Sequence, residues 1–190
     1  MTRLLLVAHG LNASLRQAVF GGTAGLDPAG LRAAEQLVAG GNEFVTADEV
    51  LAGPAPACAQ TASPFGAAAG LTVRTEPALA DCDYGAWTGR RFDEVAAADP
   101  EGVHRWLSEP DAAPHGGESL TALLSRVGDW LAGFADRRTV VVAVTHATVI
   151  RAAVVRVLGA PPESFWRIDV APAAVLRLRS SVRTWSLLAE

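Results

Sequence analysis

The sequence predicts an α/β fold in which helices flank a β-sheet. Short apolar runs alternate with amphipathic stretches along the 190 residues, an order typical of a sheet covered by helices. Half of the residues are hydrophobic and 19% are charged, a balance that supplies a sizeable core. No internal repeat or low-complexity linker interrupts the pattern. We therefore expect one domain over residues 1–190.

Three apolar runs in the first half of the chain predict strands, and two alanine-rich stretches predict helices. The strands are expected at residues 4–8, 49–52 and 71–75. Asp27 followed by Pro28 marks the start of a helix over about 29–39, because these residue types are favoured at a helix N-terminus. A second helix is expected over 56–69, with Gly70 at its C-terminal end.

The second half of the chain predicts two long helices around a buried strand. Large apolar residues recur at helical spacing over 120–134, which indicates a strong amphipathic helix. The valine-rich run 140–144 predicts a central strand. A helix over 146–158 should then end before Gly159. The tail offers three short β candidates, with an edge hairpin among them, at 166–170, 174–179 and 182–188.

The segment 76–117 differs in composition from the rest of the chain. It holds Tyr84, Trp87 and Trp106 among glycines, prolines and charged residues. Such a mixture favours short helices and long loops. Long irregular segments within a compact domain are often functional, and we expect this one to cover a site.

Composition excludes several classes of partner. The 16 basic residues are all arginine, the acidic residues number 20, and the net charge of −4 provides no basic field for nucleic acid or an anionic membrane. Arg3 precedes only a few apolar residues, too few for a secretory segment or a membrane span. Cys58 and Cys82 lack the spacing of a disulfide framework or a zinc site, so free thiols are expected. We therefore expect a soluble, cytoplasmic protein.

Two histidines stand out because each follows directly after an apolar strand. His9 ends the run Val7-Ala8-His9, and His146 ends the run Val144-Thr145-His146. In a parallel sheet both would reach the same carboxyl edge, which is where open α/β sheets bind ligands. The N-terminus of a following helix offers free N–H groups to an anion. The pair therefore indicates a site suited to an anionic ligand.

With these histidines, five motifs in order give the chain a resemblance to the histidine phosphatase superfamily, the phosphoglycerate mutase-like group. They correspond to the family's Arg-His-Gly strand end, its Ser-Pro-x-x-Arg-Ala-x-Gln-Thr-Ala helix, its acid loop, its Gly-Gly-Glu-Ser turn and its second histidine. The matching segments are His9-Gly10, Pro54 with Gln60-Thr61-Ala62, Leu79-Ala80-Asp81 with Tyr84-Gly85-Ala86-Trp87-Thr88-Gly89, Gly116-Gly117-Glu118-Ser119, and Val144-Thr145-His146. The resemblance covers nearly the whole length and implies a three-layer α/β/α fold with a mixed, mostly parallel sheet.

The resemblance also implies roles for individual residues. His9 would be the nucleophile that forms a phosphohistidine, and Asp81 the general acid, at a position where the family more often has glutamate. His146, helped by the backbone N–H of Ala147, would stabilise the phosphoryl group. Tyr84 resembles a substrate-contacting tyrosine of the mutases. The reaction needs neither a metal nor another cofactor, and its substrate would be a small, phosphorylated molecule.

The chain departs from the family at both arginines that hold the phosphate. Ala8 stands where the first arginine is expected and Ala57 where the second is expected. A charge-assisted hydrogen bond contributes about 1.5–3 kcal/mol, so the two losses amount to about 3–6 kcal/mol. Leu11 and Leu15 replace polar residues of the family, so the pocket floor is expected to be apolar.

Arg16 is the main candidate to replace a lost arginine, since it follows His9 by seven residues. Arg90 and Arg91 follow the acid loop and are secondary candidates. For Arg16 and Arg91 the alternative is an ordinary solvated arginine on the surface. Ligand contacts are therefore expected at Gly10, Arg16, Tyr84 and Ala147.

Three hypotheses about function follow. The first is a divergent phosphatase in which His9, Asp81 and His146 act on a phosphomonoester. The second keeps these residues for acid–base chemistry on a less charged substrate, which an apolar pocket would suit. The third is an inactive protein of the same fold that binds a ligand or a partner. A homo-oligomer is compatible with all three.

Overall fold

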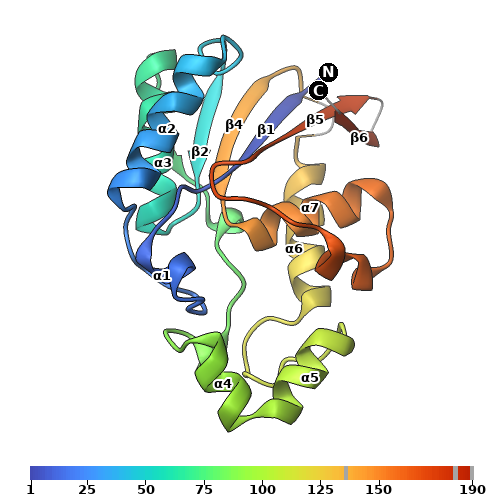
Figure 1. The fold of residues 1–190 in the computed structure, drawn as a ribbon. Helices are drawn as coiled ribbons and strands as arrows, with labels where there is room; N and C mark the ends of the chain where they lie inside the picture. Colours follow the sequence, from blue (N-terminus) through green and yellow to red (C-terminus); the bar gives the residue numbers. More distant parts are fainter. Residues whose placement is uncertain (135–136, 182–183, 189–190) are drawn as a thin grey trace.

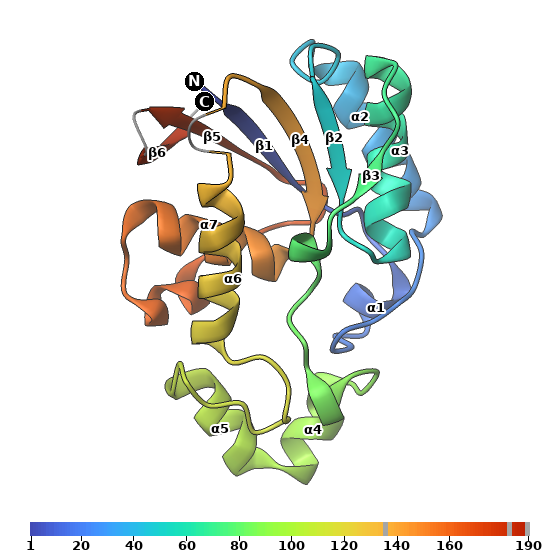
Figure 2. The same ribbon diagram turned by 180° about the vertical axis from the view of Figure 1, so that it is seen from behind.

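One mixed sheet forms the centre of the computed structural model, which describes residues 1–134, 137–181 and 184–188. Its strands are β1 (Arg3–Ala8), β2 (Glu49–Ala52), β3 (Arg74–Thr75), β4 (Val140–Thr145), β5 (Val175–Ser181) and β6 (Thr184–Leu188). Their order is β3-β2-β4-β1-β5-β6 (Figure 1, with β3 labelled in Figure 2). The first four in this order run parallel, whereas β5 runs antiparallel to β1 and to β6. The mixed, mostly parallel sheet is therefore confirmed.

Helices cover both faces of the sheet. They are α1 (Ala13–Arg16), α2 (Pro28–Gly40), α3 (Pro56–Ala69), α4 (Phe92–Ala98), α5 (Pro100–Ser108), α6 (Leu120–Ala132) and α7 (Ala147–Leu158), with 3-10 helices η1 (Pro77–Leu79), η2 (Gly85–Trp87) and η3 (Pro162–Arg167). Figure 2 shows α2 and α3 on one side of the sheet and α6 and α7 on the other. Of these described helices, none is both long and apolar enough to cross a membrane.

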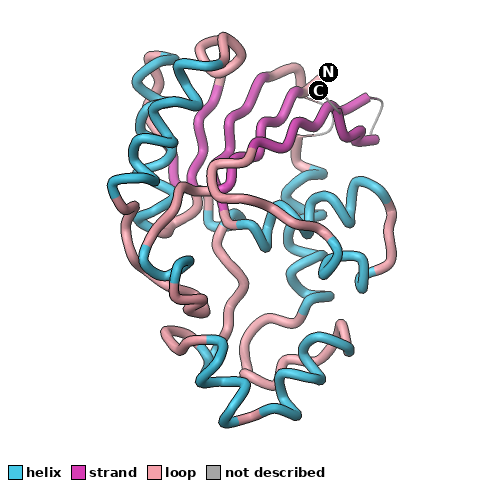
Figure 3. Tube along the Cα trace, in the orientation of Figure 1, coloured by secondary structure: helices cyan, strands magenta, loops and turns pink. Residues whose placement is uncertain are grey.

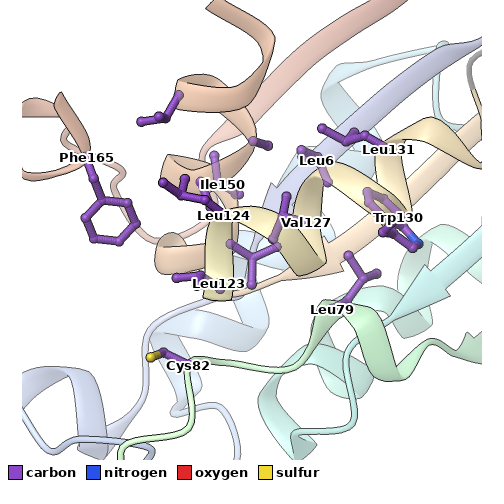
Figure 4. Packing of buried hydrophobic residues seen from close by; sticks show 14 of the residues in the cluster. Leu6, Leu79, Cys82, Leu123, Leu124, Val127, Trp130, Leu131, Ile150 and Phe165 are labelled. Carbon is purple, nitrogen blue, oxygen red and sulfur yellow. The ribbon is translucent and has the colours of Figure 1, made fainter. Parts of the chain in front are cut away.

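The two faces of the sheet build two separate cores, because side chains alternate along each strand. Leu5 and Val7 of β1 pack with α3, whereas Leu4 and Leu6 of the same strand pack with α6 and α7. Figure 4 shows the second core, in which Leu123, Val127 and their neighbours on α6 form a continuous apolar surface. The strand sequences are apolar throughout because both faces are covered.

Helix ends follow the expected glycine signals. Gly70 ends α3 with φ +68° and Gly159 ends α7 with φ +59°, both in the left-handed region that favours glycine. The expected bounds 49–52 and 56–69 agree with β2 and α3. The third strand is shorter than expected, since only two residues pair with β2.

The predicted strand at 166–170 is wrong. Trp166 lies in η3, and the residues after it form no strand. Its indole contacts Trp106 with ring centroids 4.7 Å apart, so aromatic packing between distant segments outweighs its strand propensity. The two other tail candidates form the antiparallel hairpin of β5 and β6, although residues 182–183 at the start of the last one lie outside the described residues.

The segment between β3 and α6 extends beyond the carboxyl edge of the sheet and has the short helices and long loops expected for residues 76–117. It carries η1, η2, α4 and α5 joined by loops, and Figure 3 shows the long loop stretches on both sides of α4 and α5. An aromatic cluster connects it to the loop between α1 and α2. Phe20 contacts Tyr84, Trp87 and Trp106 with centroid distances of 5.0, 5.4 and 5.6 Å.

Candidate active site

The two histidines meet because their strands are neighbours in the sheet. β1 and β4 pair in parallel with Ala8 opposite Thr145, and each histidine is the next residue along its strand. The imidazole rings are 4.9 Å apart between centroids and nearly perpendicular, at 77°. Both residues are only 6% exposed. The expectation that the two strands bring them to one edge is therefore confirmed.

The hydrogen bonds of His9 leave one ring nitrogen available. Its Nδ1 lies 2.8 Å from the carbonyl oxygen of Gly10, so Nδ1 carries the proton and Nε2 keeps its lone pair. Burial, followed by the neighbouring His146, lowers the pKa of His9 below its ordinary value. Gly10 is fixed in turn, because its N–H donates to Thr61 Oγ1 at 3.0 Å. A neutral imidazole with a free Nε2 has the properties of a nucleophile.

His146 is held on both sides of its ring. Its Nδ1 lies 3.4 Å from Asp81 Oδ2, and its Nε2 lies 3.5 Å from Cys58 Sγ. The carboxylate favours a proton on Nδ1, which leaves Nε2 to accept the thiol S–H. Cys58 is completely buried, and burial raises the pKa of its thiol to about 12. The thiol is therefore a weak donor toward His146.

Asp81 is oriented by two further donors. Its Oδ1 accepts the Thr148 hydroxyl at 2.5 Å and the backbone N–H of Cys82 at 2.9 Å. Thr148 lies in the first turn of α7, directly after His146 and Ala147. Because Ala147 begins α7, its N–H has no acceptor within the helix. Asp81 and the N-terminus of α7 therefore share one small region with His9 and His146.

Arg126 on α6 holds the loop that carries Asp81. Its guanidinium donates to the carbonyls of Ala78 and Ala80 at 2.8 and 3.1 Å and to that of Asp81 at 3.3 Å. It also pairs with both carboxylate oxygens of Glu118, at 2.8 and 2.7 Å. Sequence reasoning missed this residue. The spacing could have indicated it, because Arg126 follows Glu118 by about two helical turns, which allows the two opposite charges to meet.

The remaining sequence candidates differ in burial and in their partners. Ala8 and Ala57 are 3% and 2% exposed. Arg16 pairs with Asp27 Oδ2 through Nε at 2.9 Å and Nη2 at 2.8 Å, with its side chain 55% exposed. Arg91 pairs with Asp93 on the surface, its expected alternative role. Among the described residues, no group of three or more His, Cys, Asp or Glu side chains could hold a metal ion.

Tyr84 lies in the wall of a small cavity beside the acid loop. It is 6% exposed, and burial raises the pKa of its phenol well above the ordinary value. Its ring contacts Phe20 and Trp106, with centroids 5.0 and 6.3 Å away. Thr148 lies in the same wall and links the cavity to Asp81.

The model of the histidine phosphatase superfamily (branch 1) matches residues 4–189. A bifunctional protein of Mycobacterium tuberculosis is 36% identical over 66% of this chain and 35% of its own length. Phosphoserine phosphatase 1 of Hydrogenobacter thermophilus is 32% identical over 63% of this chain and 58% of its own length. The chain thus spans only about a third to somewhat over half of these relatives.

Solved structures share the fold of the whole chain. The α-ribazole phosphatase from Shigella flexneri superposes with a TM-score of 0.86 at 24% identity, covering 98% of this chain and 94% of that one. A mycobacterial glucosyl-3-phosphoglycerate phosphatase superposes with a TM-score of 0.83 at 22% identity, covering 97% and 96%. At these identities the likeness concerns the fold alone.

Proposed function

This chain belongs to the histidine phosphatase superfamily, and on that premise we propose that it hydrolyses small phosphomonoesters through a phosphohistidine on His9. The observation that carries the proposal is the state of His9. Its Nδ1 donates to the carbonyl of Gly10, and burial lowers the pKa of His9. Nε2 is therefore an unprotonated nucleophile at neutral pH.

In the proposed reaction, Nε2 of His9 attacks phosphorus and the bond to the leaving oxygen breaks. Asp81 donates the proton that this oxygen requires. Water then attacks the phosphohistidine, Asp81 takes up a proton from that water, and His9 is released with inorganic phosphate. No metal or other cofactor is needed, because His9 itself supplies the nucleophile.

His146 and the N–H of Ala147 would stabilise the phosphoryl oxygens during both steps. For both roles one proton would lie on Asp81 and another on His146 Nε2, so that Nδ1 accepts from Asp81 across the 3.4 Å contact and Nε2 donates to a phosphoryl oxygen in place of its 3.5 Å contact with Cys58 Sγ. Gly10 and Tyr84 would border the substrate. Arg16 would contact phosphate only after leaving Asp27, to which it is bound at 2.8 Å.

The absence of both phosphate-binding arginines lowers the expected rate of phosphomonoester hydrolysis. Ala8 and Ala57 supply no charge, which removes about 3–6 kcal/mol of phosphate stabilisation. This corresponds to turnover roughly a hundred- to ten-thousandfold below that of a site with both arginines. We therefore propose a slow phosphatase located in the cytoplasm. The phosphoserine phosphatase and the glucosyl-3-phosphoglycerate phosphatase among its relatives support a small phosphorylated substrate.

The test is turnover of p-nitrophenyl phosphate and a panel of phosphomonoesters by the unmodified protein and by His9→Ala. His104→Ala is the matched control, because His104 is an exposed histidine on α5. We expect slow turnover and a phosphohistidine, detected by mass spectrometry after rapid quenching, in the unmodified protein and the control. Turnover equal to that of His9→Ala, with no phosphohistidine, would refute the proposal.

A second candidate is acid–base chemistry on a less charged substrate. It is favoured by the pairing of His146 with Asp81 at 3.4 Å beside the apolar Ala8 and Ala57. Such an activity would depend on His146 and Asp81 but not on a phosphohistidine. Binding of a neutral organic ligand at His146 without phosphatase turnover would favour it. A folded protein without turnover in any assay would instead favour a binding role.

A further inference from the structure

A partly enclosed cavity beside Asp81 has no role in the proposed phosphoryl transfer. Its volume is about 70 Å³, room for on the order of five water molecules. Segments far apart in the sequence form its wall, through Tyr84, Trp106, Thr148, Arg151, Phe165 and Trp166. Figure 4 shows Cys82, Leu123 and Phe165, which also line it, at the edge of the apolar core of α6 and α7. The cavity is large enough for one functional group of a ligand.

Arg151 brings a positive charge without a counter-charge into this cavity. Across the described part of the chain its guanidinium forms no ion pair or hydrogen bond, and its Nε is buried without an acceptor. The group lies over the ring of Phe165, with its central carbon 5.8 Å from the ring centroid. Native proteins rarely leave a buried donor unpaired, because this forfeits the hydrogen bond to water. An acceptor from outside the chain would match it.

The surroundings of Arg151 favour a flat anionic group. Aromatic rings wall the cavity, and Trp106 and Trp166 stand edge to face 4.7 Å apart. Such walls exclude water and strengthen the attraction between opposite charges. A carboxylate is planar and matches the guanidinium with two parallel hydrogen bonds. The phenol of Tyr84 supplies a further donor from the same wall.

The position of the cavity relates it to the reacting groups. The Thr148 hydroxyl lines it and also binds Asp81 at 2.5 Å. Arg151 follows Thr148 by three residues, so the two side chains lie on one face of α7. A group bound to Arg151 would therefore lie close to Asp81, which in turn contacts His146 at 3.4 Å.

We propose that this cavity binds a carboxylate carried by the alcohol part of the substrate, with Arg151 as its charge partner and Tyr84 as a second donor. The inference rests on the proposed function, since it narrows the substrate to carboxylated phosphomonoesters. Arg151 and Tyr84 are specificity residues in this scheme, and they take no part in the transfer of the phosphoryl group.

The test compares O-phosphoserine with O-phosphoethanolamine, which differ only in a carboxylate, by calorimetric titration of His9→Ala so that turnover does not interfere. Phosphoserine should bind about 10- to 100-fold more tightly. In the double variant His9→Ala/Arg151→Met this preference for phosphoserine should be lost. Adding Arg156→Met, an exposed arginine on the same helix, should preserve it.

Equal affinities for the two esters in His9→Ala, or no measurable binding of either, would overturn the inference. So would a preference that persists in Arg151→Met. If that variant fails to fold, Tyr84→Phe provides a second test, with an expected loss of about 2- to 10-fold in the preference. Carboxylate preference without turnover by the unmodified protein would refute the phosphatase proposal alone, and turnover without the preference would refute the carboxylate subsite alone.

Discussion

Replacing Arg126 with methionine should lower the free energy of unfolding by about 2–4 kcal/mol. The guanidinium bonds to Glu118 at 2.8 and 2.7 Å and to the carbonyls of Ala78 and Ala80 at 2.8 and 3.1 Å. Breaking a buried ion pair costs about 3–5 kcal/mol. We reduce this range because the side chain of Arg126 is 25% exposed, and that of Glu118 is 14% exposed. Methionine retains most of the apolar stem, so the loss reflects the charge and its hydrogen bonds.

Urea unfolding followed by tryptophan fluorescence measures this loss. The matched control is Arg105→Met, because Arg105 forms an exposed pair with Glu109 at 3.5 Å. That pair should contribute less than about 0.5 kcal/mol. Phosphatase turnover should also fall in Arg126→Met, since the loop that carries Asp81 loses its support. KM should change little, because Arg126 does not border the substrate in the proposed scheme.

Equal losses of stability in Arg126→Met and Arg105→Met would refute this reasoning. Glu118→Gln provides a second check, because the amide keeps the shape of the carboxylate but removes its charge. The double variant should lose less than the sum of the two single losses, since both substitutions break the same ion pair. Additive losses would show that the two side chains act independently.

Three further outcomes are expected. Burial lowers the pKa of His115 from 6.5, as it lowers that of His9, so the unfolded chain binds protons first and stability should fall as the pH drops below about 6.5; His115→Phe should reduce this slope in urea unfolding and leave the part due to His9. Burial raises the pKa of Cys58 to about 12 and also raises that of Cys82, so rapid labelling of either thiol by iodoacetamide in the folded protein would contradict the structure. In Gly30→Ala the new Cβ would lie 2.2 Å from the carbonyl oxygen of Leu11, and an unchanged thermal midpoint would contradict the expected loss of roughly 2 kcal/mol.

The parts of the fold that follow local rules could be predicted from the sequence. Helix α3 begins at a proline and ends at Gly70, and both signals act within a few residues. The strand at 140–144 could be predicted from its run of valines alone. Trp166 could not be placed in this way, because its conformation depends on contact with Trp106, sixty residues earlier in the chain.

The same distinction applies to the site. His9 and His146 were recognisable because each ends an apolar strand, a pattern visible in four neighbouring residues. Cys58 and Thr148 were not, because each matters through a partner on another element. The Cys58 contact with His146 spans 88 residues, and the Thr148 bond to Asp81 spans 67. No local sequence pattern indicates contacts between residues so far apart in the chain.

The pairing of β1 with β4 has a consequence for how this site can change. Neighbouring strands lie about 4.7–4.9 Å apart because of their backbone hydrogen bonds, and the ladder between β1 and β4 continues to His9, whose N–H donates to the carbonyl of Thr145 at 2.9 Å. Main-chain geometry thus sets the spacing of the histidines, whereas side chains at Ala8 and Ala57 would set the affinity for phosphate. The scaffold separates these two properties, so charge at the site can vary while the imidazole pair keeps its place.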